Sequence, residues 1–377
     1  MRIGIITQPL HTNYGGLLQN YALQSVLKKM GHEVITINQV GFYVPLWKLI
    51  ASTVKTLLGR VVGRDKKFIS IFGEYRRKYV RKNTVKFVDK YINTTIKIKN
   101  KKILCRVAKS LCLDAYIVGS DQVWRPLYNT DLYTSFLDFT DSLQVRRIAY
   151  AASFGVDNWE FSDEQTARCR ELIQSFDAVS VRESSGIELC KQYLGVNAYH
   201  VLDPTMLLDA CDYAKLVEQE NEKISFGFLL TYVLDNDKNK QSYINNLAAE
   251  LKLPSFSVMP ELDLDSATAK CLEKCVFPSV TKWIRGFIDA KFVVCDSFHG
   301  VVFSIIFNKE FMVFGNEERG MARFRSLLKM FDLEDRIITD RNDFSVVVKP
   351  IDWNRVNRIR EEMKDFSMRF LLNYLEG

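Results

Sequence analysis

The stretch Ala290-Lys-Phe-Val-Val-Cys-Asp-Ser-Phe-His-Gly300, followed directly by the apolar run 301–307, decides the fold of this chain. An apolar segment ends in polar residues, and a second apolar segment of helical length begins at once. This pattern predicts a buried parallel strand that leads through a short loop into a helix N-terminus. Ligands bind at such strand ends, where unpaired backbone N–H groups and the helix dipole favour an anion. His299 lies at this junction; it is either a catalytic residue or only a cap of the helix.

Short apolar strands alternate with helical stretches along the rest of the chain. The alternation predicts an α/β fold, in which mostly parallel sheets carry helices on both faces. Two series of strands and helices indicate two Rossmann-like domains with a cleft between them. We expect an N-terminal domain over 1–215 and a C-terminal, donor-binding domain over 216–350. A final amphipathic helix over 351–377 is expected to pack back on the first domain.

The composition is that of a soluble globular enzyme, with 377 residues of which 47% are hydrophobic and 26% charged. No apolar run reaches the roughly 18 residues of a membrane-spanning helix, and the N-terminus is typical of a first strand rather than a signal peptide. The eight cysteines are irregularly spaced without a C-x-x-C pair. This spacing gives little support to a zinc site or a disulfide framework. We therefore expect a cytoplasmic protein without a metal site.

The net charge of +7 is concentrated in one segment. Residues 41–112 carry 19 Lys and Arg against three acidic residues, so the rest of the chain is acidic overall. Within this largely helical insertion, apolar residues with Trp47 among them recur at helical spacing between basic residues. Such a helix could bind peripherally to the inner face of an anionic membrane. The alternative is a solvated insertion that covers the sheet edge; nucleic acid is not the expected partner.

Polar loops follow the predicted strands and supply further candidates. Asn13-Tyr-Gly-Gly16 offers two glycines for close backbone approach, without the G-x-G-x-x-G pattern of a dinucleotide site. Asp121 could deprotonate a sugar hydroxyl or only cap a helix. Arg182, Arg319 and Arg323 follow other strands, where guanidinium groups suit a phosphate, a carboxylate or a structural ion pair.

Six motifs occur in order along the chain, and together they resemble the polysaccharide pyruvyl transferase family. The resemblance spans nearly the whole chain apart from the basic segment, and the order of the motifs makes it specific. The motifs are Asn13-Tyr-Gly-Gly with Leu18-Gln-Asn-Tyr-Ala-Leu23, Asp114-Ala-Tyr-Ile-Val-Gly-Ser-Asp-Gln-Val-Trp124, Ser180-Val-Arg-Glu183, Val201-Leu-Asp-Pro-Thr205, Asp296–Gly300 and Glu318–Phe324.

The resemblance implies a glycosyltransferase-B-like fold and transfer of a pyruvyl group from phosphoenolpyruvate to two hydroxyls of a glycan, free or lipid-linked. The product would be a cyclic ketal, with release of phosphate and without a cofactor. In this interpretation His299 is the general acid or base, oriented by Asp296, and Asp121 assists the acceptor. The expected substrate-binding residues are Arg182, Arg319, Arg323, Asn13, Gly15, Gly16, Ser297 and Gly300.

One departure from the family pattern leaves other functions open. Many relatives carry Arg two positions before the histidine, whereas this chain has Ser297, so Arg319, Arg323 or Lys309 would have to supply the missing cation. One alternative is a nucleotide-sugar-dependent glycosyltransferase of the same fold, although Glu310 and Glu318 give it poor support. A second alternative is an inactive, glycan-binding relative.

Overall fold

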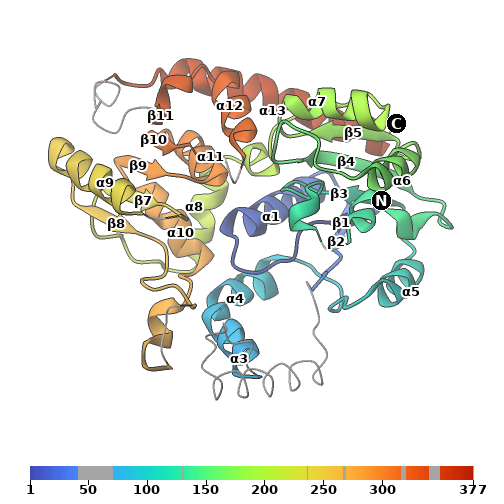
Figure 1. Ribbon diagram of the computed structural model, residues 1–377, viewed down its shortest axis with the longest axis horizontal. Coiled ribbons are helices and arrows are strands. Elements are labelled where there is room, and N and C mark those ends of the chain that lie inside the picture. Colours follow the sequence, from blue (N-terminus) through green and yellow to red (C-terminus); the bar gives the residue numbers. More distant parts are fainter. Residues whose placement is uncertain are drawn as a thin grey trace.

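The computed structural model describes residues 1–40, 71–129, 131–235, 237–265, 269–315, 320–338 and 349–376. Two parallel sheets lie side by side, each covered by helices, as the alternating pattern predicts (Figure 1). The first sheet has the order β2-β1-β3-β4-β5-β6 and the second the order β11-β10-β9-β7-β8. Their strands are β1 (Arg2–Ile6), β2 (Glu33–Thr36), β3 (Ala115–Val118), β4 (Arg146–Ala152), β5 (Ala178–Val181) and β6 (Tyr199–His200), then β7 (Leu229–Tyr232), β8 (Ser255–Ser257), β9 (Phe292–Cys295), β10 (Glu310–Phe314) and β11 (Ile337–Ile338).

Local sequence signals set the helix boundaries. Asn13 caps the N-terminus of the first helix by accepting a hydrogen bond from the Gly16 N–H, and Ser162 forms a capping box with Gln165. Every residue of α11 is buried, which explains why its sequence is apolar all round. The helices around the two sheets are α1 (Tyr14–Lys29), α6 (Asp163–Ile173), α7 (Ser185–Leu189), α8 (Ala210–Gln219), α9 (Lys238–Leu251), α10 (Val280–Asp289), α11 (Phe298–Ile306) and α12 (Met321–Met330).

One hydrophobic core runs from the first sheet into the second. It includes Leu18 of α1, a helix that packs on the first sheet, and Val301 of α11, a helix that packs on the second. At the junction the ring of Tyr14 stacks on Trp283, with centroids 5.5 Å apart, and its hydroxyl donates to the Pro278 carbonyl over 2.8 Å. The contact is large and apolar, so it fixes the strand ends of the two sheets relative to each other.

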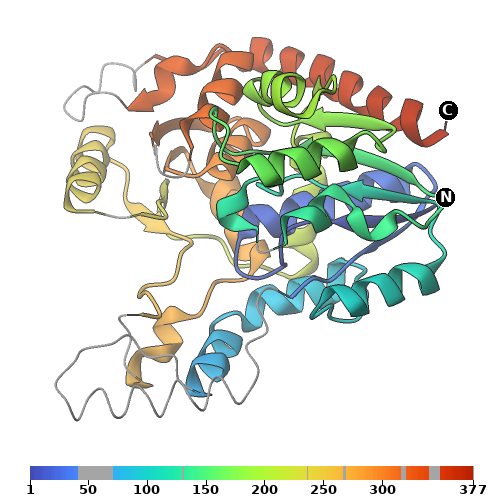
Figure 2. The same cartoon turned by 45° about the vertical axis from the view of Figure 1, so that its right-hand side comes forward.

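The chain crosses between the sheets twice. The expected boundary at residue 215 falls within α8, which packs against α10 of the second sheet. The last helix, α13 (Trp353–Glu376), runs back across the first sheet (Figure 2). There the Ser367 hydroxyl accepts a hydrogen bond from the Leu202 N–H over 3.0 Å, and Arg360 donates to the Leu208 carbonyl over 2.8 Å.

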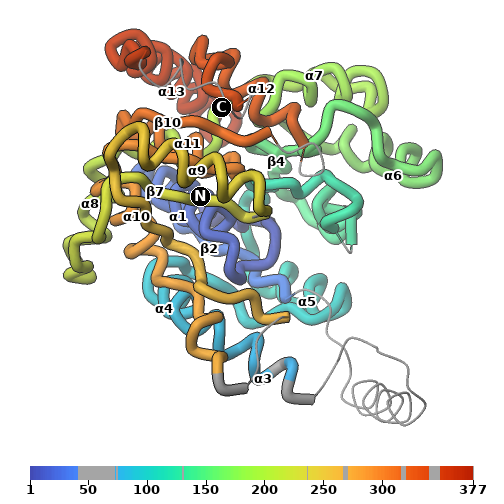
Figure 3. Tube along the Cα trace, turned by 60° about the vertical axis from the view of Figure 1, so that its left-hand side comes forward, coloured from blue at the N-terminus to red at the C-terminus, as the bar shows by residue number. Residues whose placement is uncertain are grey.

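The described part of the basic insertion is folded onto the protein. It forms α3 (Ile71–Val80), α4 (Lys82–Tyr91) and α5 (Lys101–Leu111), and Phe87 and Val88 of α4 are buried in the core. Helix α3 lies beside the 3₁₀ segment Ala269–Cys275 of the second domain (Figure 3). The apolar stripe around Trp47 lies outside the described residues. Among the helices that the structure does describe, none has the length and apolarity needed to span a bilayer.

Candidate active site

A cavity of about 1550 Å³ lies where the carboxyl ends of the two sheets face each other. Asn13 and Asp121 line it from the first sheet, and Asp296, Ser297 and His299 line it from the second. The loops after β1, β3 and β9 thus meet, as expected for ligand sites of parallel sheets.

His299 occupies the first turn of α11 and is buried between the two sheets. Its Nε2 atom lies 3.6 Å from the Oδ2 atom of Asp203, at ion-pair distance. Its Nδ1 atom lies next to Gly15: a Cβ atom on that glycine would be only 1.9 Å from Nδ1. Glycine at position 15 is therefore needed for the imidazole of one sheet to approach the first helix of the other.

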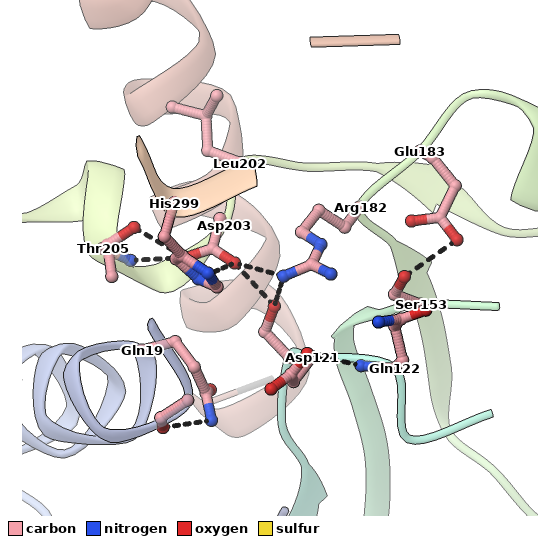
Figure 4. Close-up of polar contacts among 12 residues, drawn as sticks. Gln19, Asp121, Gln122, Ser153, Arg182, Glu183, Leu202, Asp203, Thr205 and His299 are labelled. Atoms are coloured by element: carbon pink, nitrogen blue, oxygen red, sulfur yellow. Dashed lines mark hydrogen bonds and ion pairs between the residues drawn. The ribbon is translucent and has the colours of Figure 1, made fainter. Parts of the chain in front are cut away.

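Asp203 follows β6 and holds this part of the site together (Figure 4). Its Oδ2 atom accepts hydrogen bonds from Arg182 Nη1 and Ser120 Oγ, each over 2.8 Å, and Oδ1 accepts from the hydroxyl and the N–H of Thr205. Burial acts to raise the pKa of this carboxyl, but His299, Arg182 and Thr205 outweigh burial and hold the pKa well below its usual range. Asp203 is therefore a fixed negative charge facing the imidazole.

Arg182 comes to the site but stands behind the cavity wall. Only 1% of its side chain is exposed, and it is not among the residues that line the cavity. One guanidinium nitrogen binds Asp203 and Ser120, and the guanidinium carbon lies 4.3 Å from the ring centroid of Phe298. The Nε and Nη2 atoms have no hydrogen-bond partner among the described residues. The structure thus links Arg182 to His299 through Asp203, rather than placing it on the cavity surface.

Arg323, in the first turn of α12, lines the cavity itself. Burial, and next the positive charge of Arg182, lower the pKa of its guanidinium to about 10; the nearby Asp121, Glu183 and Tyr128 act in the opposite direction. Arg182 is paired with Asp203, whereas Arg323 lies at the cavity wall, where a guanidinium can meet an anionic ligand. Lys309 donates to the Ile288 carbonyl and does not line the cavity, and Arg319 lies outside the described residues. Of the two candidate cations that the structure describes, Arg323 lines the cavity and Lys309 does not.

Asp121 has a left-handed backbone, with φ of +80°. This conformation is costly for a residue other than glycine, and such strain concentrates at functional sites. Its Oδ2 atom accepts from Asn13 Nδ2 over 3.1 Å, and Oδ1 accepts from the Gln122 N–H over 2.9 Å. A Cβ atom on Gly16 would be 3.2 Å from the same carboxylate, so this glycine also gives room to Asp121. Asn13 serves both as a helix cap and as a holder of Asp121.

Asp296 was expected to orient His299, but its hydrogen bonds point elsewhere. Its carboxylate accepts from the Leu234 and Asp235 N–H groups and from Lys240 Nζ, which lies 2.8 Å away. These bonds join the loop after β9 to the loop after β7. The carboxylate that faces His299 is Asp203 instead, because β6 and not β9 ends opposite the imidazole.

Ser297 and Gly300 have different surroundings. Ser297 lines the cavity just before α11. Gly300 packs inward: a Cβ atom there would come within 2.8 Å of Cys295 and 3.2 Å of Tyr232. Glycine is therefore required here for packing of the helix against the strand. Gly300 was expected to bind substrate, but it packs inward and does not line the cavity.

Two residues of the site were missed in the sequence. Asp203 follows the last strand of the first sheet, so the rule that found Asp121 and Arg182 applies to it equally. Glu183 is buried and accepts from Ser153 Oγ and from the Phe154 and Gly155 N–H groups, which fixes the loop after β4. Its sequence signal is an acidic residue directly after a buried strand, beside Arg182.

Known structures resemble this one over its full length. The UDP-GlcNAc 2-epimerase from Methanocaldococcus jannaschii has a TM-score of 0.54 at 10% sequence identity, with 100% of both chains covered. UGT89C1 from Arabidopsis thaliana, complexed with UDP-L-rhamnose, has a TM-score of 0.52 at 8% identity, with 99% of this chain and 98% of that chain covered. At these identities the likeness concerns the fold alone, which is glycosyltransferase-B-like as predicted.

Sequence comparison identifies the family. No curated protein matches the chain. The sequence model of polysaccharide pyruvyl transferases, however, matches residues 13–318, a range that contains His299, Asp203, Arg182 and Asp121. Since this match covers most of the chain, the protein belongs to the polysaccharide pyruvyl transferase family.

Proposed function

We propose that the protein transfers a pyruvyl group from phosphoenolpyruvate to two hydroxyls of a sugar in a polysaccharide or its precursor. Two C–O bonds form between the sugar hydroxyl oxygens and the central carbon of the donor. The bond between that carbon and the phosphate oxygen breaks. One hydroxyl proton ends on the methylene carbon, which becomes a methyl group, and the other leaves with the phosphate. The observation that carries this proposal is the buried imidazole of His299, which lies at the cavity with a fixed carboxylate, Asp203, behind it.

The proton transfers are assigned to His299. The Asp203 carboxylate faces Nε2, while Nδ1 packs against Gly15. A positioned imidazole can give and take a proton near neutral pH. We assign the His299 imidazole as the group that protonates the methylene carbon of the donor.

The donor anion is assigned to Arg323. Phosphoenolpyruvate carries a phosphate and a carboxylate, which guanidinium groups bind through charge-assisted hydrogen bonds. Arg323 lines the cavity, whereas the charge of Arg182 behind it is paired with Asp203. Arg323 therefore supplies the charge neutralisation in this proposal, without a metal ion or cofactor.

The acceptor is assigned to the first sheet. Asp121, held by Asn13, presents a carboxylate in the cavity that can accept a hydroxyl proton as the sugar oxygen attacks. This places the acid and the base on different sheets, with donor and acceptor between them.

Ligand-induced stabilisation tests the donor assignment. A ligand that binds only the folded protein raises its thermal midpoint. We expect phosphoenolpyruvate to stabilise the wild type, and Arg323→Gln to remove most of that shift because the cavity loses its lining cation. A shift with UDP-GlcNAc but none with phosphoenolpyruvate would favour a nucleotide-sugar glycosyltransferase. A shift with neither would favour an inactive, glycan-binding relative.

Glu310, which with Glu318 gives only poor support to a glycosyltransferase, has a structural role in this protein. Glu310 accepts from the Ile351 N–H over 3.0 Å and lies 3.3 Å from Arg336. It thereby ties β10 to the segment before α13. Glu318 lies outside the described residues.

We also propose that the basic insertion 41–112 brings the enzyme to the inner face of an anionic membrane. Because residues 71–112 are folded against the protein, the contact is assigned to 41–70, which contain Trp47. Flotation with vesicles that contain anionic lipid tests this: Trp47→Glu should reduce the floated fraction, whereas an unchanged fraction would contradict the contact.

A further inference from the structure

Two large apolar side chains are exposed on the wall of the cavity. Leu127 is 69% exposed and Tyr128 42%, and both line the cavity that contains Asp121. They belong to the 3₁₀ turn Pro126–Tyr128, a few residues after the loop that carries this carboxylate. Apolar groups left in contact with water beside polar catalytic groups indicate a surface that a ligand covers.

The tyrosine ring is held from behind. The guanidinium carbon of Arg125 lies 4.9 Å from the ring centroid of Tyr128, and Arg125 itself is buried. Glu160 binds this guanidinium through two bonds, to Nε over 3.0 Å and to Nη2 over 3.1 Å. Gln122 adds a third bond, to Nη1 over 3.3 Å. The ring therefore has a fixed position before any ligand arrives, which lowers the entropy cost of binding to it.

The turn itself is fixed as well. The Asn129 side chain donates to the Val123 carbonyl over 2.8 Å and to Ser135 Oγ over 2.7 Å. Exposure of Leu127 and Tyr128 is therefore a property of a braced turn.

The cavity is larger than the donor requires. Its volume of about 1550 Å³ exceeds the ~300–1,000 Å³ of ordinary small-molecule pockets. His299 and Arg323 account for one part of its lining, where the three-carbon donor is assigned. The remaining volume is available to a second, larger molecule. Leu127, Tyr128 and Asp121 line the same cavity, and Tyr128 and Asp121 are close enough to Arg323 to influence its pKa, so this second molecule would lie beside the donor.

We propose that Leu127 and Tyr128 form the acceptor platform, on which the C–H face of a pyranose ring of the acceptor glycan stacks. A pyranose has an apolar face of C–H groups and a polar edge of hydroxyls. The electron-rich face of the phenol ring attracts the C–H groups, and Leu127 adds apolar contact. The hydroxyl edge then remains free for Asp121. This inference rests on the proposed function in one respect: that the acceptor is a sugar.

Saturation-transfer NMR with methyl β-D-galactopyranoside and methyl β-D-glucopyranoside tests the platform without turnover. In the wild type, saturation should reach the ring C–H protons of at least one glycoside. Tyr128→Ala should weaken that glycoside's binding about tenfold, the loss of roughly one aromatic contact. Tyr128→Phe keeps the ring and should bind within about threefold of the wild type. Phe226→Ala, which removes a fully exposed aromatic ring that does not line the cavity, is the matched control and should have no effect.

The outcomes separate the platform from the proposed reaction. Loss of glycoside binding in Tyr128→Ala, with phosphoenolpyruvate binding unchanged in calorimetry, supports the platform. Equal glycoside binding by Tyr128→Ala and wild type overturns it, as does a wild type that binds neither glycoside. If the wild type binds a glycoside through Tyr128 but does not bind phosphoenolpyruvate, the platform stands and the donor assignment fails.

Discussion

Asp203 and Asp296 make an instructive pair. Each lies just beyond the carboxyl end of a strand, each side chain is completely buried, and each accepts a hydrogen bond from a cation 2.8 Å away. Asp296 also accepts hydrogen bonds from two backbone N–H groups of the loop after β7, which belongs to the same sheet. Asp203 instead faces an imidazole that belongs to the other sheet. The comparison teaches that the packing of the two sheets decides whether a carboxylate at a strand end faces an imidazole.

Removal of the imidazole should have the largest effect. His299→Ala deletes the group that Asp203 faces, and positioned acid–base groups contribute about 10²–10⁴-fold to rate. We expect phosphate release from phosphoenolpyruvate, with the pyranosides as acceptors, to fall about 10³-fold. Circular dichroism should show an unchanged fold. Wild-type turnover in a folded His299→Ala protein would remove the imidazole from the mechanism.

Asp203→Asn should reduce turnover about 10–100-fold, because the imidazole loses the carboxylate that faces and orients it. It should also destabilise the fold by about 3–5 kcal/mol, because Arg182 is left as an unpaired buried charge. The double variant Asp203→Asn with Arg182→Gln removes both charges. Urea unfolding should show that its stability recovers in part, while kinetics should show that its activity does not. Recovery of both would mean that Asp203 acts only on stability.

A small side chain at position 15 tests the contact between the sheets. In Gly15→Ala the new Cβ atom would lie 1.9 Å from His299 Nδ1, so the imidazole must move. We expect turnover to fall about tenfold to a hundredfold, since a displacement of this size disturbs catalytic geometry. Gly31→Ala is the control: φ of +87° makes this substitution costly in stability too, but no atom lies within 4 Å of its Cβ position, so it strains the backbone without displacing the imidazole. Undiminished turnover in Gly15→Ala would show that the imidazole need not occupy its observed place.

The opposite pattern is expected for Asp296. Asp296→Asn weakens the bonds to Leu234, Asp235 and Lys240 but leaves the imidazole and its carboxylate in place. The free energy of unfolding should fall by about 3–5 kcal/mol, as for Asp203→Asn, because buried Lys240 loses its ion-pair partner. The kcat should nevertheless stay within about threefold of the wild type. A loss of turnover as large as that of Asp203→Asn would break the distinction between the two carboxylates.

The pH dependence of unfolding should show the smallest but most specific difference between the wild type and Asp203→Asn. The pKa of Asp203 is held well below its usual range in the folded protein. Its contribution to stability is therefore complete above the unfolded-state pKa of ~3.9 and is lost as the pH falls below that value. Urea midpoints between about pH 3 and 7 should show a steeper acid decline in the wild type than in Asp203→Asn. The exposed Asp332, replaced by Asn, is the control; parallel curves for all three proteins would contradict the assignment.

Sequence periodicity was sufficient for the fold, because buried parallel strands and their helices leave a strong apolar pattern. The rule that ligands meet strand ends also found His299, Asp121 and Arg323, which line one cavity. The partner of His299 could not be deduced in the same way. Asp296 is three residues away in the chain, yet Asp203, which is remote in sequence, faces the imidazole. Only the packing between the sheets determines that choice.

The predictions for Gly15 and Arg182 show the same limit of reasoning from the sequence. The glycine pair after β1 predicts close approach of another group, and at Gly15 that group is the imidazole of the other domain rather than a ligand. Arg182 was expected to contact the donor, but its burial places it one layer behind the cavity. A guanidinium at a strand end has the same sequence pattern whether it lines a cavity or supports the residue that does.

A crystal structure of the protein with phosphoenolpyruvate tests the central claim most directly. We expect the donor in the cavity between His299 and Arg323, with its methylene carbon beside the imidazole and Asp203 still facing that ring. Donor bound away from the imidazole, or an imidazole that no longer faces Asp203, would contradict the proposed roles.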